Sequence, residues 1–375
     1  MILEKNLHIV CLDIPYPVDY GGVFDLFYKI KTLHELGINI HLHCFEYGRG
    51  EQSILNNYCV EVNYYERKMG HKGFSAEIPY IVSSRSSQQL FENLQKDDFP
   101  ILLEGIHCTY PLYCNGLNNR RVFLRLHNVE FQYYYHLFRY ENSLLKKAYF
   151  YNESRLLKCY EQSIANKASI IAVSQKDIQT YQNVFGAKDI SYLPVFTPFQ
   201  QIESIEGIGT YCLYHGNLSV TENEKAAVWL LDNVFNKIKM PFVIAGKNPS
   251  ARLERLAHLN CHTCLIANPG EDEIKDLISK AQVNILPSFN ETGVKLKLLN
   301  ALYNGRHCVV NDAAITGSGL EAACHIGSTA EALRQIIVQL YHHPFGEEEI
   351  RLRKKLLCSH YDNHRNGQKL ISLIW

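Results

Sequence analysis

The sequence predicts an α/β protein built from two Rossmann-like, doubly wound domains that face each other across a cleft. Short apolar runs alternate with segments of helical periodicity, a pattern typical of parallel sheets covered by helices. The alternation stops at a stretch interrupted by prolines and glycines and then begins again. The 375 residues also exceed the length at which a single hydrophobic core usually stops growing. Together these observations favour two domains of similar architecture.

The first expected strand spans residues 7–12, a predominantly apolar run with the sequence Leu-His-Ile-Val-Cys-Leu. A loop with prolines and glycines follows at residues 15–22, and a helix is expected from residue 23 to residue 36. Gly37 is expected to end this helix, because glycine is favoured just beyond a helix C-terminus.

Residues 38–45 alternate between apolar and polar side chains, which predicts a second strand. His41 and His43 share one face of that strand, and we interpret them as part of the scaffold rather than as metal ligands. The remaining strands of the first domain are expected at residues 100–103, 122–126 and 169–173.

A long helical segment, residues 131–167, is rich in tyrosine and contains several basic residues. We interpret it as an amphipathic helix pair whose tyrosines pack with their hydroxyl groups in water. The alternative is an interfacial surface for a lipid-linked or glycan acceptor, with peripheral contact to the inner face of a membrane. The tyrosines are Tyr133, Tyr134, Tyr135, Tyr140, Tyr149, Tyr151 and Tyr160, and the basic residues are Lys146, Lys147, Arg155 and Lys158.

The predicted linker lies at residues 194–210, where prolines and glycines interrupt the periodicity. The first domain is therefore expected at residues 1–200 and the second at 201–362, with a last helix near 363–375 that packs back onto the first. Strands of the second domain are expected at residues 211–214, 242–245, 263–266, 283–286 and 307–310. Its helices are expected at residues 224–236, 271–281 and 295–303.

The overall composition excludes several classes of protein. The chain has 38 basic and 38 acidic residues, so its net charge gives no reason to expect nucleic acid as a partner. No window approaches the roughly 18 apolar residues of a membrane-spanning helix, and the N-terminus lacks the form of a signal peptide. The twelve cysteines are scattered, as expected of reduced thiols in a cytoplasmic protein. Cys261 and Cys264 have the spacing of metal ligands but no second pair nearby, so no metal site is expected.

Two segments of the first domain contain candidate binding residues. Gly21 and Gly22 end the loop after the first strand, where glycines let a ligand approach the backbone at the start of a helix. A tight turn is the alternative. His127 follows the strand at residues 122–126, where it could exchange a proton with a sugar hydroxyl. A purely structural histidine is the alternative there.

The most informative segment of the second domain is residues 286–302, which predict a strand, a polar glycine-containing loop and a helix. Backbone amides at Gly293 and Val294, together with the helix dipole, favour a bound diphosphate. Lys295 or Lys297 would neutralise its charge. A lysine pair that is simply solvated is the alternative.

Several stretches, in this order along the chain, resemble the retaining glycosyltransferases of the GT-B fold, the family also called glycosyl transferases group 1. They comprise the loop that ends in Gly21-Gly22, Leu126-His127-Asn128-Val129-Glu130, Ile170-Ile171-Ala172-Val173-Ser174, Tyr214-His215-Gly216-Asn217-Leu218, the segment from Phe242 to Pro249, and Pro287 through Leu320.

The resemblance implies that the first domain binds the acceptor and that the second binds a nucleotide-diphosphate sugar, the donor substrate, with no further cofactor. Gly21 and Gly22 would lie near the reacting sugar or the donor phosphate, and His127 would line the cleft. In the second domain Glu291 would contact the donor hexose. The diphosphate would lie by Gly293, Val294 and Lys295, and the ribose by Asn300.

The sequence departs from the family pattern at two of these positions. The resemblance places glutamate at the ribose position, where this chain has Asn300, a neutral and weaker hydrogen-bond partner. It also places an arginine or lysine after the first strand of the second domain, where Gly216 is followed here by Asn217. Lys247 is the residue that would supply the charge instead.

The resemblance thus implies a metal-independent hexosyltransferase that acts on a saccharide or lipid-linked acceptor with retention of configuration, in surface polysaccharide or glycan biosynthesis. The residues expected to take part in catalysis are His127, Glu291 and Lys295. One alternative is a degenerate, non-catalytic protein that binds nucleotide sugars or glycans. Another is an epimerase-hydrolase of the same fold, which would need further acid and base carboxylates that the sequence does not show.

Overall fold

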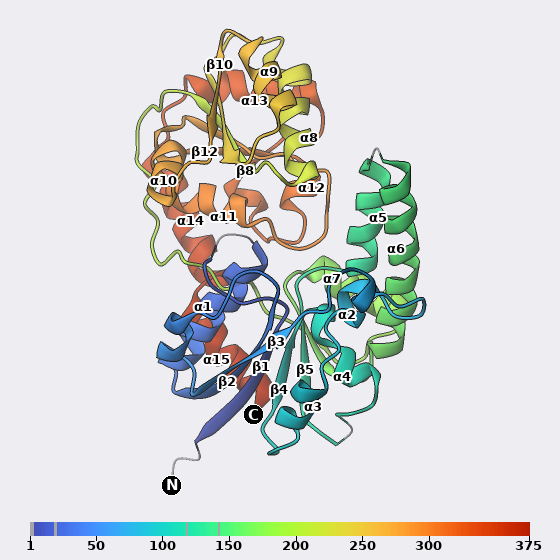
Figure 1. Cartoon of the computed structure of the whole chain (residues 1–375). Helices are drawn as coiled ribbons and strands as arrows, with labels where there is room; N and C mark the ends of the chain where they lie inside the picture. Colours follow the sequence, from blue (N-terminus) through green and yellow to red (C-terminus); the bar gives the residue numbers. More distant parts are fainter. Residues whose placement is uncertain (1–3, 19–20, 118, 142) are drawn as a thin grey trace. The chain divides into compact units, whose positions relative to one another are not determined.

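The computed structural model describes residues 4–18, 21–117, 119–141 and 143–375 (Figure 1). The chain forms two compact units. The N-terminal unit comprises Met1–Pro198 and Tyr361–Trp375, and the C-terminal unit comprises Phe199–His360. Each unit is an α/β layer structure around its own parallel sheet, so the prediction of two doubly wound α/β domains is confirmed.

The N-terminal unit contains a seven-stranded sheet in the order β3-β2-β1-β4-β5-β6-β7. All of its strand pairs are parallel. Because β1 pairs with both β2 and β4, the order of strands reverses beside β1, and loops at the carboxyl ends of these strands diverge there. The strands are β1 (Lys5–Cys11), β2 (Ile38–Glu46), β3 (Glu61–Glu66), β4 (Ile101–Glu104), β5 (Val122–Leu126), β6 (Ser169–Ala172) and β7 (Ile190–Tyr192).

Helices cover both faces of this sheet, and each face has its own apolar core. One core includes residues of α1 and α15, and the other includes residues of α2, α3 and α6. The helices are α1 (Gly21–Glu35), α2 (Tyr80–Ser83), α3 (Gln88–Leu94), α4 (Tyr110–Tyr113), α5 (Glu130–Tyr140), α6 (Leu144–Ile164), α7 (Gln175–Phe185) and α15 (Asn363–Ile374), with short 3-10 turns η1 (Ser53–Asn57), η2 (Gly70–Gly73) and η3 (Ile106–Cys108).

The last helix, α15, returns to the N-terminal unit and packs against α1. Asp362 caps its first turn by accepting a hydrogen bond from the amide of Arg365. Gly367 lies where a Cβ atom would come within 2.6 Å of Leu36 and 2.8 Å of Thr32. The lack of a side chain at this position therefore allows the two helices to approach closely.

His41 and His43 belong to a histidine network on one face of β1 and β2. His8 Nδ1 lies 2.9 Å from His43 Nε2, and His8 Nε2 lies 3.0 Å from Asp97. On its other side, His43 Nδ1 lies 2.7 Å from the hydroxyl of Tyr65. These ring nitrogens of His8 and His43 therefore have protein partners, which agrees with a scaffold role.

The C-terminal unit contains a six-stranded sheet in the order β10-β9-β8-β11-β12-β13, again parallel throughout. The strand order reverses beside β8, which pairs with β9 and β11. The strands are β8 (Cys212–Asn217), β9 (Phe242–Lys247), β10 (Thr263–Ala267), β11 (Val283–Ile285), β12 (His307–Val310) and β13 (His325–Ile326). The helices are α8 (Thr221–Leu230), α9 (Ala251–His258), α10 (Glu271–Lys280), α11 (Leu296–Asn304), α12 (Asp312–Ile315), α13 (Ala330–Tyr341) and α14 (Glu347–His360), with a π-helical turn η4 (Leu231–Phe235) and a 3-10 turn η5 (Glu321–Ala323).

The structure differs from the sequence prediction at several elements. The helix pair predicted at residues 131–167 is confirmed as the hairpin of α5 and α6, although it begins one residue earlier, at Glu130, and ends three residues earlier, at Ile164. The predicted helix 224–236 begins at Thr221 and ends in the π-helical turn. Sheet-edge strands β3, β7 and β13 were not predicted, because each is only partly buried and lacks the continuous apolar run of a central strand.

The cysteines are free thiols with mixed burial: Cys11 and Cys44 are buried, for example, whereas Cys261 and Cys264 are exposed. Within the described ranges, no helix has both the length and the hydropathy needed to cross a membrane.

Candidate active site

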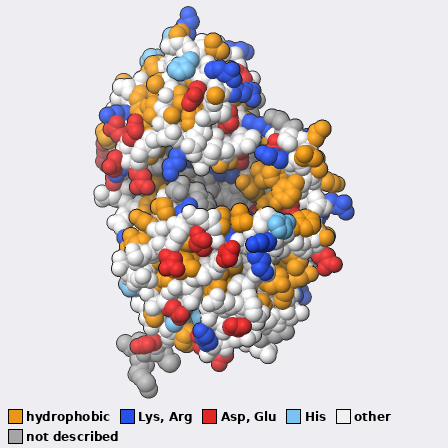
Figure 2. Space-filling view, in the orientation of Figure 1, with side chains coloured by type: hydrophobic (Ala, Val, Ile, Leu, Met, Phe, Trp, Pro, Cys, Tyr) orange, Lys and Arg blue, Asp and Glu red, His pale blue; other side chains and the backbone are white. Residues whose placement is uncertain are grey.

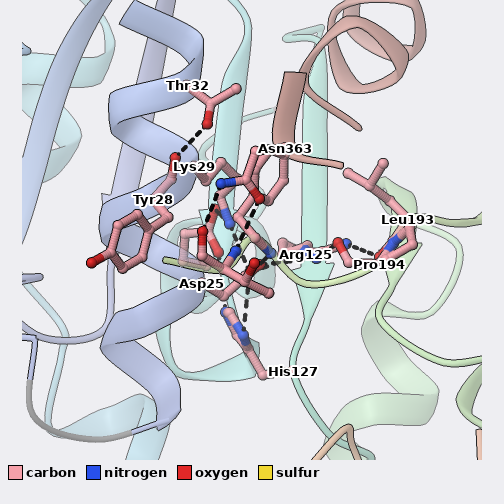
Figure 3. Close-up of polar contacts among 12 residues, drawn as sticks. Asp25, Tyr28, Lys29, Thr32, Arg125, His127, Leu193, Pro194 and Asn363 are labelled. Atoms are coloured by element: carbon pink, nitrogen blue, oxygen red, sulfur yellow. Dashed lines mark hydrogen bonds and ion pairs between the residues drawn. The ribbon is translucent and has the colours of Figure 1, made fainter. Parts of the chain in front are cut away.

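Five ionisable side chains of the N-terminal unit meet at the carboxyl end of its sheet, and we call them the charge cluster (Figure 3). Asp25 and Lys29 lie one helical turn apart on α1, and their side chains point toward the sheet. Glu104 is the last residue of β4, and in the strand register it pairs with Arg125 of β5. His127 follows β5 directly, so it lies at the same edge. The fold thus brings together residues that are up to 102 positions apart, from Asp25 to His127.

Positive and negative charges alternate within the cluster. Lys29 Nζ lies 3.0 Å from an oxygen of Asp25 and 2.8 Å from an oxygen of Glu104. The Arg125 guanidinium lies 3.2 Å from Asp25 and donates to the carbonyls of Leu193 and Pro194 at 2.6 and 2.8 Å. Two carboxylates therefore face two cations, none of them exposed by more than 2%. Mutual pairing is what makes this burial tolerable, since an unpaired charge would be strongly destabilising there.

The same pairing keeps the two carboxyl groups ionised. Burial alone would raise the pKa of Asp25, but the charges of Arg125 and Lys29 hold that pKa below its usual value. Burial likewise works against ionisation of Glu104, and Lys29 and His127 lower its pKa in spite of it. The site therefore presents two fixed negative charges to the ring of His127.

His127 is the member of the cluster with the most contact to solvent, with 13% of its side chain exposed. Its Nε2 lies 3.0 Å from Glu104, within hydrogen-bond distance, whereas its Nδ1 lies 3.7 Å from Asp25. If the neutral ring donates its Nε2 proton to Glu104, Nδ1 is left as an acceptor. In this arrangement the ring would accept a hydrogen bond from a ligand hydroxyl through Nδ1.

Asp25, Glu104 and His127 also have the composition of a metal site, because one ligand atom of each lies within 4.8 Å of the others. The Nζ atom of Lys29, however, already lies within 3.0 Å of both carboxylates. Divalent cations and ammonium groups compete for the same oxygens, so these residues do not fit a bound metal ion.

Gly21 and Gly22 are the first two residues of α1. The amides of a first helical turn have no partner within the helix and can bind an anion. The preceding loop residues Asp19 and Tyr20 lie outside the described part of the chain. The carboxyl end of β1 leads into this loop, so the start of α1 belongs to the same sheet edge as His127.

In the C-terminal unit, the predicted donor residues belong to the ends of β8 and β9 and to the loop and helix that follow β11. Gly216 and Asn217 end β8, and in the register they pair with Gly246 and Lys247 of β9. A Cβ atom on Gly246 would lie only 1.9 Å from the Gly216 carbonyl oxygen, so a glycine is required there. Lys247 is exposed at the end of its strand.

The loop between β11 and α11 is held in one shape by its own side chains. Ser288 donates to Glu222 at 2.7 Å, and its amide donates to Asn311 at 2.9 Å. Asn290 accepts hydrogen bonds from both the amide and the hydroxyl of Thr292 at 2.9 Å. Gly293 has a φ of 63°, in the left-handed region that favours glycine. The loop therefore reaches α11 in a fixed conformation, with Glu291 exposed.

The two lysines of this segment have different surroundings. Lys295 is the N-cap of α11, rather than its first residue as predicted, and its Nζ donates to the carbonyl of Thr292 at 2.7 Å. Lys297 lies in the first turn, and its Nζ donates to Asn223 at 3.1 Å and contacts the Tyr214 hydroxyl at 3.3 Å. Within the described residues, no carboxylate lies within 4.0 Å of Lys297 Nζ.

Among the described residues, Lys297 thus has no carboxylate counter-ion, and its ammonium group has little contact with water. Burial is the main cause that lowers its pKa to about 8, and the charge of Glu222 partly opposes this effect. Asn223 connects Lys297 to the end of β8, because its Nδ2 donates to the carbonyl of Asn217 at 2.9 Å. An anion placed here would restore the charge balance and favour the ammonium form.

Asn300, predicted at the ribose position, is engaged within its own helix. Its side-chain oxygen accepts a hydrogen bond from Asn304 at 2.8 Å, and its backbone carbonyl accepts another at 3.1 Å. A carbonyl oxygen has a second lone pair, so a further hydrogen bond from a hydroxyl remains feasible.

Sequence reasoning missed the partners of the predicted residues in both units. It did not identify Asp25, Lys29, Glu104 or Arg125, although each interrupts an apolar helix face or strand, which is a recognisable signal. It also missed Asn223, which no local pattern distinguishes from an ordinary residue of a first helical turn.

Comparisons with known proteins bear on the fold of the chain and on the family that its C-terminal unit resembles. Residues 209–343 match the family described as "Glycosyl transferases group 1". The chain is 26% identical over 329 residues to an uncharacterised 44.6 kDa protein in the cps region of Klebsiella pneumoniae, covering 83% of this chain and 84% of that one.

Three solved structures resemble almost the whole chain. Sucrose-phosphate synthase from Thermosynechococcus elongatus has a TM-score of 0.71 at 14% identity, over 99% of this chain and 98% of that one. The Anabaena protein HepE, in complex with UDP and glucose, has a TM-score of 0.67 at 11% identity, over 99% of each chain. WaaG, a glycosyltransferase involved in lipopolysaccharide biosynthesis, has a TM-score of 0.65 at 10% identity, over 98% of this chain and 99% of that one.

These comparisons establish the fold of the chain as the two-domain α/β fold of GT-B glycosyltransferases. The residues that match the group 1 glycosyltransferase family all lie in the C-terminal unit.

Proposed function

We propose that this protein is a hexosyltransferase that uses a nucleoside diphosphate sugar and transfers the sugar, with retention of configuration, to a saccharide or lipid-linked acceptor in surface polysaccharide or glycan biosynthesis. The observation that carries the proposal is Lys297, a lysine without a carboxylate partner at the start of α11. It lies where the strand order of the C-terminal sheet reverses, the usual ligand position in open α/β sheets.

The donor diphosphate would bind at the N-terminus of α11. The amides of Gly293 and Val294 precede the helix, and the helix dipole favours negative charge at this end. Lys297 would supply the positive charge, while Lys295 and the exposed Glu291 would contact the donor from the loop. The solved structures named above include one with UDP and glucose bound, which supports this class of donor.

Departure of the nucleoside diphosphate builds negative charge on the leaving phosphate. Preorganised amides and a lysine at this position stabilise that charge in the transition state. We therefore expect the reaction to need no divalent metal. The measurement is the rate of sugar transfer before and after dialysis against a chelator, and a loss that added magnesium or manganese restores would contradict this expectation.

The acceptor would bind to the N-terminal unit, where His127 would accept a hydrogen bond from a sugar hydroxyl through Nδ1. Glu104 would hold the ring in the tautomer that allows this. Gly21 and Gly22 would offer the first amides of α1 to the reacting sugar or to the donor phosphate.

The first experiment is a thermal stabilisation assay with UDP, GDP, ADP and their sugar conjugates. A ligand at a hundred times its dissociation constant stabilises the native protein by about 2.7 kcal/mol. One nucleotide series should raise the melting temperature of the wild type but not of Lys297→Met. Lys355→Met, which changes an exposed lysine of α14, is the matched control and should respond like the wild type.

The second candidate function is a binding protein without turnover, because the side chain expected to hold the ribose is the neutral Asn300, where the resemblance implies a glutamate. The two functions differ in one measurement. A protein that is stabilised by a nucleotide sugar, yet neither transfers nor hydrolyses the sugar over long incubation, would be a binding protein. No stabilisation by any nucleotide at millimolar concentration would contradict both functions.

A further inference from the structure

We infer that the N-terminal unit binds an acidic sugar residue of the acceptor and that Arg67 recognises its carboxylate. The inference rests on the proposed function, because it names the chemical class of the acceptor. Arg67 directly follows β3, so it lies at the carboxyl edge of the sheet, as His127 does at the end of β5. At this edge a guanidinium without an acidic partner adjoins a pocket with aromatic walls.

The guanidinium of Arg67 is held in place by neighbouring side chains. Its Nε donates to the Ser84 hydroxyl at 3.2 Å. The central carbon of the guanidinium lies 4.4 Å from the ring centroid of Tyr47 and 5.6 Å from that of Tyr80, which are cation–π distances. A side chain fixed in this way loses little conformational freedom when it binds a ligand.

Arg67 has no acidic partner within the described parts of the chain. No carboxylate oxygen there lies within 4.0 Å of its guanidinium, and its two Nη groups donate no hydrogen bond to those residues. The segment 67–76 also contains Lys68 and Lys72 but no aspartate or glutamate. A carboxylate would balance this positive charge, and its planar geometry matches two parallel hydrogen bonds from a guanidinium.

A pocket of about 490 Å³ adjoins Arg67 through the ring of Tyr80. Its walls are mainly aromatic, and Phe74 is 65% exposed. Aromatic rings pack well against the apolar C–H face of a pyranose, and a few polar groups beside such walls fix the orientation of a ligand. Figure 2 shows hydrophobic side chains gathered on the face of the molecule over α2, α5 and α6. The residues that line the pocket are Gly70, His71, Phe74, Tyr80 and Tyr149.

The segment that forms one wall of the pocket has a fixed conformation. The amide of Gly70 donates to the Tyr80 hydroxyl at 2.9 Å, and the Ser83 hydroxyl donates to the carbonyl of Gly73 at 2.6 Å. A Cβ atom at Gly73 would lie only 2.3 Å from the carbonyl oxygen of Lys68, so a glycine is required there. The pocket is therefore formed before a ligand binds, and little ordering has to accompany binding.

Arg67 and His127 belong to the same sheet edge, but they are too far apart to bind the same sugar ring. In the strand order, β3 and β5 are separated by four spacings of about 4.8 Å each, on the order of 19 Å. His107 lies near both side chains, because burial and the positive charges of Arg85, His127 and Arg67 together lower its pKa. The acidic sugar would thus precede the sugar whose hydroxyl reacts, so the acceptor would be an oligosaccharide.

Other ligands fit these residues less well. A wholly apolar ligand would cover Arg67 and leave its charge without water or a partner, which is costly. A phosphate group carries up to two negative charges at neutral pH, whereas Arg67 supplies one positive charge. The next basic residue, Lys68, is already engaged, since its Nζ donates to the Ser86 hydroxyl at 2.7 Å.

The test is a glycan-binding assay with the full chain and without nucleotide. The probes are oligosaccharides of glucuronic, galacturonic and mannuronic acid, each paired with its carboxyl-reduced neutral form, together with phosphorylated mannose oligosaccharides. The wild type should bind at least one acidic probe about tenfold or more tightly than its reduced form, as expected for a hydrogen bond to a charged group. Equal affinity within every pair, no binding of any probe, or binding of the phosphorylated probes alone would overturn the proposal.

Variants assign the preference to Arg67. Arg67→Gln should abolish the preference for the acidic probe and leave the affinity for the reduced form unchanged. Arg365→Gln, which changes an exposed arginine of α15 in the same unit, is the matched control and should retain the preference. An Arg67→Gln protein that still prefers the acidic probe would contradict the role of this residue.

The aromatic wall is tested separately, so that the proposal does not depend on one variant. Phe74→Ser should weaken binding of the acidic and the reduced probe alike, because the stacking contact does not depend on charge. Tyr135→Ser, which changes a tyrosine of α5 that is 46% exposed, is the control and should bind like the wild type. Unchanged binding by Phe74→Ser would exclude the pocket as the sugar site.

The outcomes separate this site from the transferase function. Binding of an acidic oligosaccharide by a protein that transfers no sugar would support the site and count against the transferase. Transfer to neutral acceptors alone would support the transferase and exclude the acidic site. If both proposals hold, Arg67→Gln should raise KM for the acidic acceptor about tenfold and leave kcat unchanged, the result expected when an interaction contributes equally to the ground state and the transition state.

Discussion

Lys29 has the largest expected effect on stability among the residues of the charge cluster, because it neutralises two carboxylates. It lies 3.0 Å from Asp25 and 2.8 Å from Glu104, and neither it nor Glu104 is exposed to solvent. Lys29→Met would leave the Asp25 carboxylate paired with Arg125, and the Glu104 carboxylate with only its contact to His127. We expect the free energy of unfolding of the N-terminal unit to fall by about 3–5 kcal/mol. Urea denaturation measures it.

The double variant Lys29→Met with Glu104→Gln is the control for this interpretation. It removes one charge of each sign, so part of the stability should return. If the double variant is less stable than Lys29→Met alone, charge balance is not what makes Lys29 important.

His127 is the residue of the cluster expected to contact the substrate. His127→Gln should reduce kcat for sugar transfer by about a hundredfold or more, the usual effect of removing a proton-exchanging group. The nucleotide-induced rise in melting temperature should be unchanged, because the donor site belongs to the C-terminal unit. The measurement is kcat together with thermal stabilisation, and unchanged kcat would assign His127 to the scaffold.

At the scale of elements, the histidine network of β1 and β2 makes the N-terminal sheet sensitive to acid. Burial lowers the pKa of His43 to about 3, from an ordinary value of 6.5. In the unfolded chain His43 therefore binds a proton as the pH falls below about 6.5, whereas in the folded chain it does not. The resulting stability is complete above pH 6.5 and is lost progressively toward pH 3.

We expect the free energy of unfolding to decrease as the pH falls from 6.5 to 3. For His43→Gln the free energy of unfolding should change less steeply with pH. Denaturant titrations at several pH values measure the slope. Equal slopes for the variant and the wild type would show that other groups control acid stability.

Glu130, at the start of α5, makes the stability of the folded protein depend on pH in the opposite direction. Burial, reinforced by the charge of Glu161, raises its pKa to about 8 from 4.5. The folded state then holds a proton that the unfolded state has released, so stability falls as the pH rises from 4.5 through 8. Glu130→Gln resembles the protonated acid. It should change stability little at pH 5 and should stabilise the protein by a few kcal/mol, on the order of the linkage effect, at pH 9.

Thermal unfolding at pH 5 and pH 9 measures this difference. A variant that is no more stable than the wild type at pH 9 would contradict a protonated Glu130 in the folded state.

The central strands of both sheets were predictable from the sequence, whereas the partners of the site residues were not. The segment at 122–126 predicted a strand with His127 at its end, because apolar periodicity is a local property. The contact of His127 with Glu104 depends on which strands become neighbours and in which register. The neighbours and the register of a strand follow from pairing between distant segments, which a local sequence pattern does not reveal.

Local chemistry also fails to distinguish two lysines that are two residues apart. Lys295 and Lys297 were both predicted to neutralise a diphosphate. The surroundings of the two lysines depend on the residue at which α11 begins. Lys295 is the N-cap of this helix, whereas Lys297 lies in its first turn and contacts Asn223. A shift of one residue in a helix boundary, which sequence reasoning cannot resolve, therefore changes which side chain lacks a counter-ion.

At the scale of the whole molecule, each unit has its own sheet and its own tryptophan, so each can be followed separately. Trp375 lies in the N-terminal unit, and Trp229 lies in the C-terminal unit, where its ring is 5.8 Å from that of Phe289 in the loop before α11. Trp229→Phe leaves only Trp375 as a fluorescent reporter, and Trp375→Phe leaves only Trp229.

We expect the donor nucleotide to raise the midpoint of urea unfolding that Trp229 reports, and to leave the midpoint that Trp375 reports unchanged. A ligand stabilises chiefly the cooperative unit that supplies most of its contacts, and the proposed donor residues other than Gly21 and Gly22 belong to the C-terminal unit. Lys29→Met should have the complementary effect and lower the Trp375 midpoint alone. If ligand and mutation instead shift both midpoints together, the two units unfold as one, and the donor cannot be assigned to the C-terminal unit by this measurement. A nucleotide that raises only the Trp375 midpoint would place the donor in the N-terminal unit and contradict the role proposed for Lys297.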